Sequence, residues 1–600
     1  MVLQTILFPS RDSAPDTELF FRGVSDLPCD VERIELKKGQ TLSLESYFNS
    51  FSIGKWMTYT VLDNLSLELS FEGDAQIRAY VSVGRKDDNI MEVRSEEEMY
   101  AAIHAQKKPC PITVERTSAG AVVRFGLLPE EGICFVELTA EEDCVFLGGA
   151  YGTDVKEDTL RPVELALAIC TFQREKEVRR NVGLILDRLI ECSESCLYHH
   201  AQVFISDNGQ TLETDEFHND RVHIFPNVNA GGAGGFTRTM IESVYRSGEN
   251  FTHIILMDDD IELYPPVIER TYRLLQMMKD EWARAVVGGA MLELVKRYQQ
   301  FESGASFLGI NLVSYNHGWD LRRAEVIAAN EVKNPINYTG WWYCCIPTEN
   351  IRELGLPLPQ FIHYDDIEYG VRNAKYGTIL MNGLCVWHPY GLNKQAVSMN
   401  YYDIRNVMIA MAGSPSPCTK IQALVRFLGT IWTETLRYRY NSAECFFLGI
   451  EDYYKGPEYF MQIEPVSNHK RIAANNDVYE DPVGIDLSLV ENRTIEERPP
   501  HCVVWGALCW LLPPLGKDRY IGLRDTGVPF FSKRLYFYDE NRKKGFWMER
   551  NYKIFFRYIG RTLRDSLMIL QNHDRMAERY RRMKPEYTSL AFWEKYLHID

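Results

Sequence analysis

Three consecutive aspartates, Asp258, Asp259 and Asp260, follow a short apolar run at residues 253–257. The run has the length and composition of a buried strand in a parallel sheet, and ligands of such sheets bind outside the carboxyl ends of the strands. Adjacent carboxylates raise each other's pKa, and a divalent cation would relieve that conflict. A loop could turn Asp258 and Asp260 toward one ion, and hard oxygen ligands suit Mg²⁺ or Mn²⁺. A solvated acidic turn is the alternative.

Two later motifs could complete such a site. Asp365 and Asp366 stand where a helix is predicted to begin, which is a favourable place for carboxylates. Capping needs only one of them, so Asp366 is left as a candidate general base. His388 ends a predicted strand just before Pro389, and its imidazole could be a third metal ligand, although a lone histidine is as often structural.

Three further strand ends carry polar or glycine-rich sequence. Arg174 follows the first strand at a strand-to-helix turn, where backbone N–H groups can meet a diphosphate or a base. Asp207 ends the second strand and could accept from a uracil N–H or a ribose hydroxyl, although Asp-Asn-Gly is also an ordinary turn sequence. Residues 227–236 are rich in glycine, which lets a backbone approach a ligand closely, and a helix is predicted to begin near Thr237. Their spacing is not GxGxxG, which disfavours a dehydrogenase.

An aromatic pair follows Gly340. Trp341 and Trp342 could stack on the C–H faces of an acceptor sugar or could be part of the core.

The elements that must position these residues fall into three regions. Residues 1–155 predict a β-sandwich, because short runs with alternating apolar and polar residues are separated by Gly, Asp and Asn. Those runs are 65–71, 77–83, 122–125 and 133–138. Such a sandwich could bind glycans or serve as a scaffold.

Residues 156–400 alternate between strand-like and helical patterns, which predicts an α/β fold with a parallel sheet. The predicted strands are 165–171, 201–206, 222–225, 253–257 and 378–386, and the predicted helices include 175–192 and 237–245.

Residues 401–600 are predicted to be mainly helical. Within 552–570, Phe555, Ile559, Leu563, Leu567 and Leu570 recur at helical spacing with arginines between them. Residues 517–600 carry an excess of basic side chains, which is compatible with a contact to an anionic membrane but does not favour it over core packing. An amphipathic helix packed on the protein's own core is the alternative.

Composition limits the classes of function. A chain of 600 residues implies several domains, and 45% hydrophobic with 25% charged residues is ordinary for globular protein. A net charge of −17 argues against nucleic acid as the main partner. The 14 cysteines include no CxxC pair, the start lacks a signal-peptide pattern, and the longest apolar run, 502–515, is shorter than the about 20 residues that a bilayer requires. We therefore expect a cytoplasmic protein.

In their order along the chain, these motifs resemble those of family 2 inverting glycosyltransferases with the GT-A fold. The motifs are Cys170-Thr-Phe, Ser206-Asp-Asn, Asn229 with the glycine run, Met257-Asp-Asp-Asp260, Asp365-Asp366 and Trp387-His388. The β-rich front, Gly340-Trp-Trp-Tyr343 and Tyr364-Asp-Asp-Ile-Glu368 look most like the bacterial galactofuranosyltransferases that polymerise cell-wall galactan.

The resemblance implies a role for each matching residue. Asp258, Asp260 and His388 would hold Mn²⁺ or Mg²⁺, and Asp366 would be the base. The nucleotide end of the donor would be bound by Phe172, Arg174, Asp207, Asn229 and Asp259. The acceptor would be lined by Asp365, Trp341 and Trp342.

The predicted reaction is a single displacement with inversion, moving galactofuranose from UDP-galactofuranose to a growing cell-surface glycan, free or lipid-linked. Transfer of another sugar, rhamnosyl or galactopyranosyl, and a glycan-binding scaffold with an inactive core are the alternatives. A sugar-1-phosphate nucleotidyltransferase is disfavoured because the first strand lacks a Gly-rich, basic loop. The resemblance leaves open a homo-oligomer and a peripheral contact with the inner face of the cell membrane.

Overall fold

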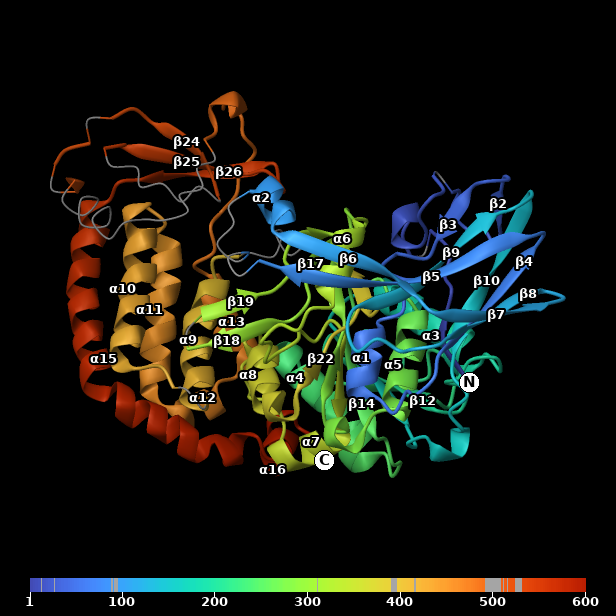
Figure 1. The fold of residues 1–600 in the computed structure, drawn as a ribbon. Helices are drawn as coiled ribbons and strands as arrows, with labels where there is room; N and C mark the ends of the chain where they lie inside the picture. The colour runs from blue at the N-terminus through green and yellow to red at the C-terminus, as the bar shows by residue number, and fades with distance from the viewer. Residues whose placement is uncertain are drawn as a thin grey trace.

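A computed structural model of the protein describes residues 1–600 except 12, 26, 88–89, 91–94, 310, 390–395, 415–416, 492–508, 511, 515, 524–530 and 600. Most of the apolar run 502–515 lies outside the described residues. The chain is a mixed α/β protein that runs from a β-rich front through a central sheet to a helical end (Figure 1). None of the helices in the described part of the chain combines the length and apolarity that crossing a bilayer requires.

The front of the chain forms two antiparallel sheets. One has the order β1-β10-β4-β8-β7, with β2 also paired to β10, and the other has the order β3-β9-β5-β6. Their strands are β1 (Val2–Thr5), β2 (Ile34–Leu36), β3 (Thr41–Ser43), β4 (Ser66–Glu72), β5 (Ala75–Lys86), β6 (Ile103–Cys110), β7 (Ile112–Thr117), β8 (Gly120–Phe125), β9 (Ile133–Ala140) and β10 (Cys144–Gly152). Alternate residues of β4 are buried, as its period of two predicts. The four predicted strands are confirmed.

A seven-stranded sheet with the order β13-β12-β11-β14-β21-β15-β22 forms the centre. Four adjacent strands of this sheet are parallel, namely β11 (Leu165–Thr171), β12 (Ala201–Asp207), β13 (Val222–Pro226) and β14 (His253–Asp258). β12 and β14 flank β11 on opposite sides, so the strand order reverses there. The carboxyl ends of β11 and β14 therefore border the crevice in which open α/β sheets bind ligands.

The predicted strand 378–386 is wrong, because the run divides between two sheets. β22 (Thr378–Ile379) pairs with β15 (Val286–Gly288) at the end of the central sheet. β23 (Cys385–His388) pairs with β16 (Ala290–Glu293) in a four-stranded sheet. Gly383, with φ of +77°, turns the chain between them, a conformation that glycine adopts readily.

The helix expected near Thr237 begins earlier, inside the glycine run. Helix α4 spans Gly231–Met240. A Cβ on Gly235 would come within 2.1 Å of Cys170 Sγ, so glycine allows this helix to lie directly against the end of β11. Close packing outweighs the weak helix propensity of glycine here.

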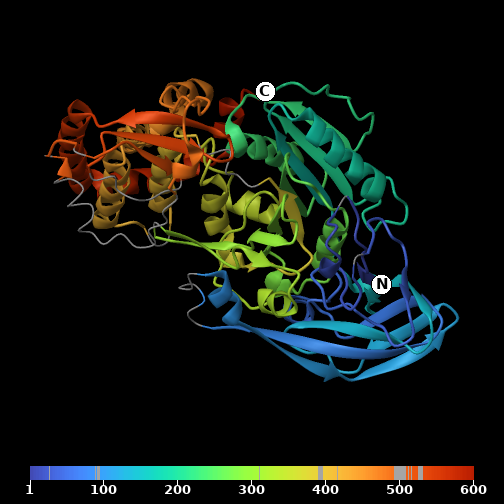
Figure 2. The same ribbon diagram turned by 90° about the horizontal axis from the view of Figure 1, so that it is seen from above.

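The C-terminal region contains α9 (Met399–Ala412), α10 (Lys420–Leu436), α11 (Tyr440–Lys455), α12 (Pro457–Gln462), α13 (Pro465–Ala473), α15 (Tyr552–Tyr587) and α16 (Leu590–Tyr596). It also contains a three-stranded sheet of β24 (Arg519–Gly522), β25 (Arg534–Asp539) and β26 (Lys544–Glu549). Seen from above, this region and the β-rich front lie on opposite sides of the central sheet (Figure 2).

The face of α15 that packs inward differs from the predicted apolar stripe. Phe555 is buried, but Leu563 and Leu567 are 62% and 57% exposed. Arg561 is not simply solvated, because its guanidinium donates to the carboxylates of Glu444 and Glu451 on α11, at 2.6 and 2.8 Å. Packing on the protein's own core thus accounts for only part of the stripe.

Candidate active site

The predicted metal ligands come together at the end of β14. His388 Nε2 lies 3.0 Å from Asp260 Oδ1 and 3.7 Å from Asp258 Oδ2. One ligand atom from each of the three residues lies within 4.8 Å of the others. The backbones of Glu262 and Trp387 exchange hydrogen bonds of 2.7 and 3.3 Å, which brings the end of β23 beside the aspartate loop.

The chemistry of this group suits a divalent cation. His388 Nδ1 lies 2.9 Å from the carbonyl oxygen of Pro389, which can only accept, so Nδ1 carries a proton. Nε2 of His388 then faces the two carboxylates and is the ring nitrogen available to a metal ion. Two hard oxygen ligands and an imidazole, whose other nitrogen is fixed by a backbone carbonyl, form a donor set that Mn²⁺ or Mg²⁺ can use. Binding of the ion itself stays a prediction.

The middle aspartate has other partners. Asp259 Oδ2 accepts from the Thr171 hydroxyl at 2.9 Å and from the Phe172 N–H at 3.4 Å. Asp259 Oδ1 accepts from Arg174 at 2.9 Å, and the same guanidinium also contacts Asp260. Burial raises the pKa of Asp259 to about 6, although Arg174 opposes that rise. Asp259 therefore ties the end of β11 to the aspartate loop, and Asp260 lies between Arg174 and His388.

A buried asparagine that the sequence analysis did not identify holds the loop of residues 258–261 in place. Asn181 lies in α3 (Glu175–Ile185), and its Nδ2 donates to the carbonyls of Asp259 and Ile261 at 3.3 and 3.0 Å. It is buried. Its position in the inward-facing apolar stripe of a predicted helix was the available signal.

The residues predicted to bind the nucleotide differ in their exposure and in the hydrogen bonds that they already make. Phe172 is 47% exposed beside the crevice. The carboxylate of Asp207 is fully buried and accepts from the backbone N–H groups of residues 209, 211 and 212, so it shapes its own loop. Asn229 Oδ1 accepts from the Gly231 N–H at 3.1 Å. Contact with a nucleotide stays a prediction for each of them.

Asp365 and Asp366 begin helix α8 (Asp365–Asn373), as predicted. Burial raises the pKa of Asp365 to about 6. Burial, followed by the charge of Asp365, raises the pKa of Asp366 well above its ordinary value. The charge of Asp258 contributes to both shifts, so the carboxylates at the end of β14 and at the start of α8 are close enough to interact electrostatically.

The glycine run packs against the segment that precedes these acids. We name residues 360–364 the acid loop. A Cβ on Gly231, whose φ is +70°, would lie 2.0 Å from the carbonyl oxygen of Phe361. A Cβ on Gly232 would lie 3.3 Å from Asp365 Oδ2. The glycines expected to approach a ligand thus allow the acid loop to approach α4.

The two tryptophans occupy different environments. Trp341 is 5% exposed and packs edge-on against Phe236 and Tyr369, so the core alternative holds for it. Trp342 is half-buried, and its indole N–H donates to the Gly289 carbonyl at 2.8 Å. An acceptor contact stays a prediction, and of the pair only Trp342 has appreciable exposed surface.

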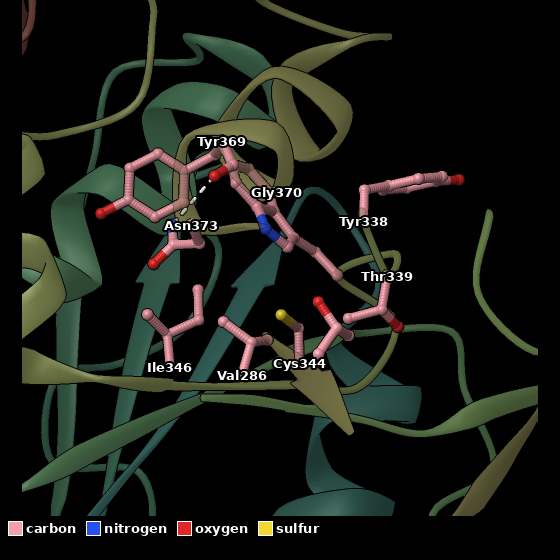
Figure 3. Close-up of a pocket in the computed structure, with 10 residues that line it drawn as sticks. Val286, Tyr338, Thr339, Cys344, Ile346, Tyr369, Gly370 and Asn373 are labelled. Carbon is pink, nitrogen blue, oxygen red and sulfur yellow. Dashed lines mark hydrogen bonds between the residues drawn. The ribbon is translucent and has the colours of Figure 1, made fainter. Parts of the chain in front are cut away.

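Helix α8 is seated firmly on the central sheet. Its inner face carries Tyr369, Gly370 and Asn373 and lies over Val286 and the strand β21 (Cys344–Pro347) (Figure 3). The cavity that remains between them holds about 10 Å³, too little for a sugar. This cavity is therefore not a candidate for the substrate site.

Comparisons with known proteins show which enzymes this chain resembles. A family model described as "Galactofuranosyltransferase 2 N-terminal" matches residues 3–153. The galactofuranosyltransferase GlfT2 of Mycobacterium tuberculosis is 24% identical over 511 residues, covering 80% of this chain and 72% of the relative. GlfT2 of Mycolicibacterium smegmatis is 25% identical over 457 residues, covering 72% and 66%. This chain is a glycosyltransferase related to the GlfT2 galactofuranosyltransferases.

One solved structure is a more distant likeness of this glycosyltransferase. The mannosyltransferase PcManGT from Pyrobaculum calidifontis, in complex with GDP-Man and Mn²⁺, has a TM-score of 0.28 and 9% identity. It covers 54% of this chain and 88% of its own. At this level of similarity we base no argument on it.

Proposed function

We propose that the chain transfers galactofuranose from UDP-galactofuranose to a growing glycan, with inversion and with the help of a divalent cation. The observation that carries the proposal is that two acid groups lie close enough to interact electrostatically. Asp258 and Asp260, with His388, form one group, and Asp365 with Asp366 forms the other. The choice of sugar rests on the names of the two GlfT2 relatives.

Asp366 is the proposed base. It takes the proton of the acceptor hydroxyl while that oxygen forms its bond to the anomeric carbon. The bond from the anomeric carbon to the diphosphate breaks, and UDP leaves with the electron pair. Burial and the charge of Asp365 raise the pKa of Asp366, which strengthens it as a base. A divalent cation on Asp258, Asp260 and His388 would neutralise charge on the departing diphosphate.

The donor is proposed to lie along the ends of β11 to β13. Phe172 and Asn229 would contact the nucleotide, and Arg174, already paired with Asp259 and Asp260, would fix the loop beneath the diphosphate. Asp207 supports this surface through its loop. Trp342 would line the acceptor side.

We also propose three domains, a β-sandwich at 1–155, a GT-A core at 156–400 and a mainly helical region at 401–600. The strand order of the central sheet, with acids at the end of β14, supports the GT-A assignment. The two antiparallel sheets at the front support the sandwich.

A donor screen tests the sugar. The protein with Mn²⁺ is incubated with an acceptor glycan and UDP-galactofuranose, UDP-galactopyranose or dTDP-rhamnose, and released nucleotide is measured. UDP-galactofuranose should be turned over fastest. Release from another donor alone would correct the sugar, and binding of glycan without release from any donor would favour the scaffold alternative.

A substitution tests the base. Asp366→Asn should lower kcat by about 10²- to 10⁴-fold, because general base catalysis contributes that much, while UDP affinity stays unchanged. Asp187→Asn, at an exposed site beyond α3, is the control and should have no effect. Transfer by Asp366→Asn at the wild-type rate would place the base elsewhere.

An apolar patch on α10 and α15 supports a peripheral contact with an anionic membrane at its inner face. Its exposed residues are Ile421, Val425, Phe556, Leu563, Leu567 and Leu570. Arg557 and Arg564 flank the leucines, with about three-fifths of each side chain exposed. Apolar side chains bordered by arginines are typical of helices that lie in a membrane interface.

Vesicle sedimentation tests this contact. The wild-type chain should bind phosphatidylglycerol vesicles and bind phosphatidylcholine vesicles less. The double variant Leu563→Glu, Leu567→Glu should lose that binding, whereas Leu127→Glu, at an exposed leucine of the front region, should retain it. Equal binding by both variants would refute the role of this patch.

A further inference from the structure

The acid loop has an unfavourable backbone conformation. Phe361, His363 and Tyr364 have φ values of +73°, +64° and +68°, although none of them is glycine. Side chains with a Cβ rarely adopt this left-handed region, so the surrounding structure must hold the loop there. The loop ends at Asp365, so its conformation sets the direction in which Asp366 enters the crevice.

A single amide side chain on α9 contacts most of this loop. Asn406 Nδ2 lies 3.1, 2.9 and 2.8 Å from the carbonyl oxygens of Gln360, Ile362 and His363. The amide has two hydrogens, so three carbonyls share them. Asn406 is fully buried, which excludes water as a replacement partner.

Asn406 is itself held in one orientation. Its Oδ1 accepts from Arg405 Nε at 2.9 Å, which identifies Nδ2 as the end that faces the loop. Arg405 also donates to the Gln360 carbonyl and to the Tyr401 hydroxyl, both at 3.0 Å. On the opposite side, Gly231 closes against the Phe361 carbonyl. The loop is therefore fixed between α9 and α4.

We propose that Asn406 is a positioning residue for transfer, holding the acid loop in its left-handed conformation so that Asp366 meets the acceptor hydroxyl. The inference rests on the proposed function, in which Asp366 is the base. Through Asn406, the helical C-terminal region would help to position the base, although Asn406 itself touches no reacting atom.

An apolar side chain of the same size could not do this. Leucine at position 406 would remove the Asn406 donor from the carbonyls of Ile362 and His363 and would leave the Gln360 carbonyl with Arg405. Polar groups that lose their partner at a partly buried site are costly. The loop would then relax toward ordinary backbone angles and move the start of α8. A displacement of about 1 Å can cost about 10²-fold in rate, because the base must lie within reach of its proton.

The test is Asn406→Leu in the full chain with Mn²⁺, UDP-galactofuranose and acceptor. We expect kcat to fall about 10²-fold, with the donor KM and the Mn²⁺ affinity unchanged. The acidic limb of the pH profile of kcat should move to lower pH, because a relaxed loop would expose Asp366 to more water and lower its pKa. The charged groups around Asp366 include Asp365, Glu302 and Asp258, and His363 of the acid loop, and the variant substitutes none of them.

Asn350→Leu is the matched control. Asn350 is equally buried, and its Nδ2 donates to the Arg284 carbonyl and to Asn373 Oδ1, at 3.0 and 2.9 Å, at the opposite end of α8 from the acid loop. It should lower thermal stability without moving the pH profile. A merely structural role for Asn406 would give the same result as this control.

A second variant covers failure to fold. Asn406→Gln keeps both amide hydrogens but extends the side chain by one methylene, so it should fold and show an intermediate kcat with a shifted acidic limb. Wild-type kcat and pH profile in either folded variant would overturn the proposal. If Asp366→Asn is inactive in the same assay, only the positioning role has failed, whereas an active Asp366→Asn would show that the proposed base is wrong.

Discussion

Replacing Asp365 by asparagine should stabilise the protein, and the gain should depend on pH. Asp365 is buried at the start of α8, close to the charges of Asp366 and Asp258. Burial raises its pKa from 3.8 to about 6, so the folded state binds the proton more tightly than the unfolded chain does. Folding therefore becomes less favourable as pH rises from about 4 to about 6, and the penalty is then constant above about 6.

The size of the penalty follows from the shift. A rise of about two pKa units corresponds to about 3 kcal/mol at pH 7 and to about 1 kcal/mol at pH 4.5. Asparagine resembles the protonated acid and escapes this penalty. It also loses the favourable interaction of a carboxylate with a helix N-terminus, about 0.3–1 kcal/mol. The net gain at pH 7 should be about 2 kcal/mol, and the gain should almost vanish at pH 4.5.

Thermal unfolding of the metal-free protein in EDTA measures this difference. Asp365→Asn should raise the Tm of the catalytic region by about 4–8 °C at pH 7 and by much less at pH 4.5. Asp63→Asn, at an exposed carboxylate of the front region, is the control and should change neither value. A loss of stability at pH 7, or a gain that is the same at both pH values, would refute the reasoning.

Three other outcomes follow from the same site. In the pH profile of kcat, the acidic limb should lie above pH 4 in the wild type. Asp365→Asn should move that limb to lower pH, because the charge of Asp365 contributes to the raised pKa of Asp366. An acidic limb at the same pH in both proteins would contradict this. Gly231→Ala should destabilise the protein by about 1–3 kcal/mol and lower kcat, because the new Cβ would collide with the Phe361 carbonyl. The control Gly183→Ala, on α3 with open space around it, should be neutral or stabilise the protein by up to about 1 kcal/mol. His388→Gln should weaken Mn²⁺ binding at least about tenfold in an EPR titration, and unchanged affinity would remove His388 from the metal site.

The elements with strong periodicity were predictable from the sequence. The strands β11 to β14 have short apolar runs that end in polar residues, and the runs of β4 and β5 alternate with period two. The acids at 258–260 and 365–366 stood out because carboxylates at the ends of buried elements are not explained by packing. The sequence could thus name the metal and base candidates before the fold was known.

The distances between those candidates were not predictable. His388 reaches Asp260 because residues 378–388 divide between two sheets and Trp387 pairs with Glu262, which no local pattern shows. The glycine run was predicted as a loop since glycine is a poor helix former, and its helical start depends on contacts with Cys170 and Phe361. Tertiary packing decided both cases.

Two buried asparagines with proposed positioning roles were not identified from the sequence. Asn181 and Asn406 sit on inward-facing surfaces of helices, where an amide is costly unless its hydrogen bonds are satisfied. A polar residue inside an apolar helical stripe is a readable signal, and residues 401–412 contain one in Arg405 and Asn406. The partners, which are backbone carbonyls of a distant loop, become visible only in the fold.

Several contacts from the C-terminal region hold the proposed base, Asp366, in place. Besides Asn406, Lys584 at the end of α15 donates to Glu368 at 2.6 Å, and Glu368 also accepts from Arg372 within α8. Trp593 of α16 donates its indole N–H to the Pro357 carbonyl at 2.9 Å, just before the acid loop. A crevice with clustered acids and left-handed residues is unstable by itself and persists only when other contacts offset its cost. The proposed catalytic residues lie before position 400, but contacts from beyond it help to fix the acid loop and α8, so the proposed catalytic unit includes the C-terminal helices.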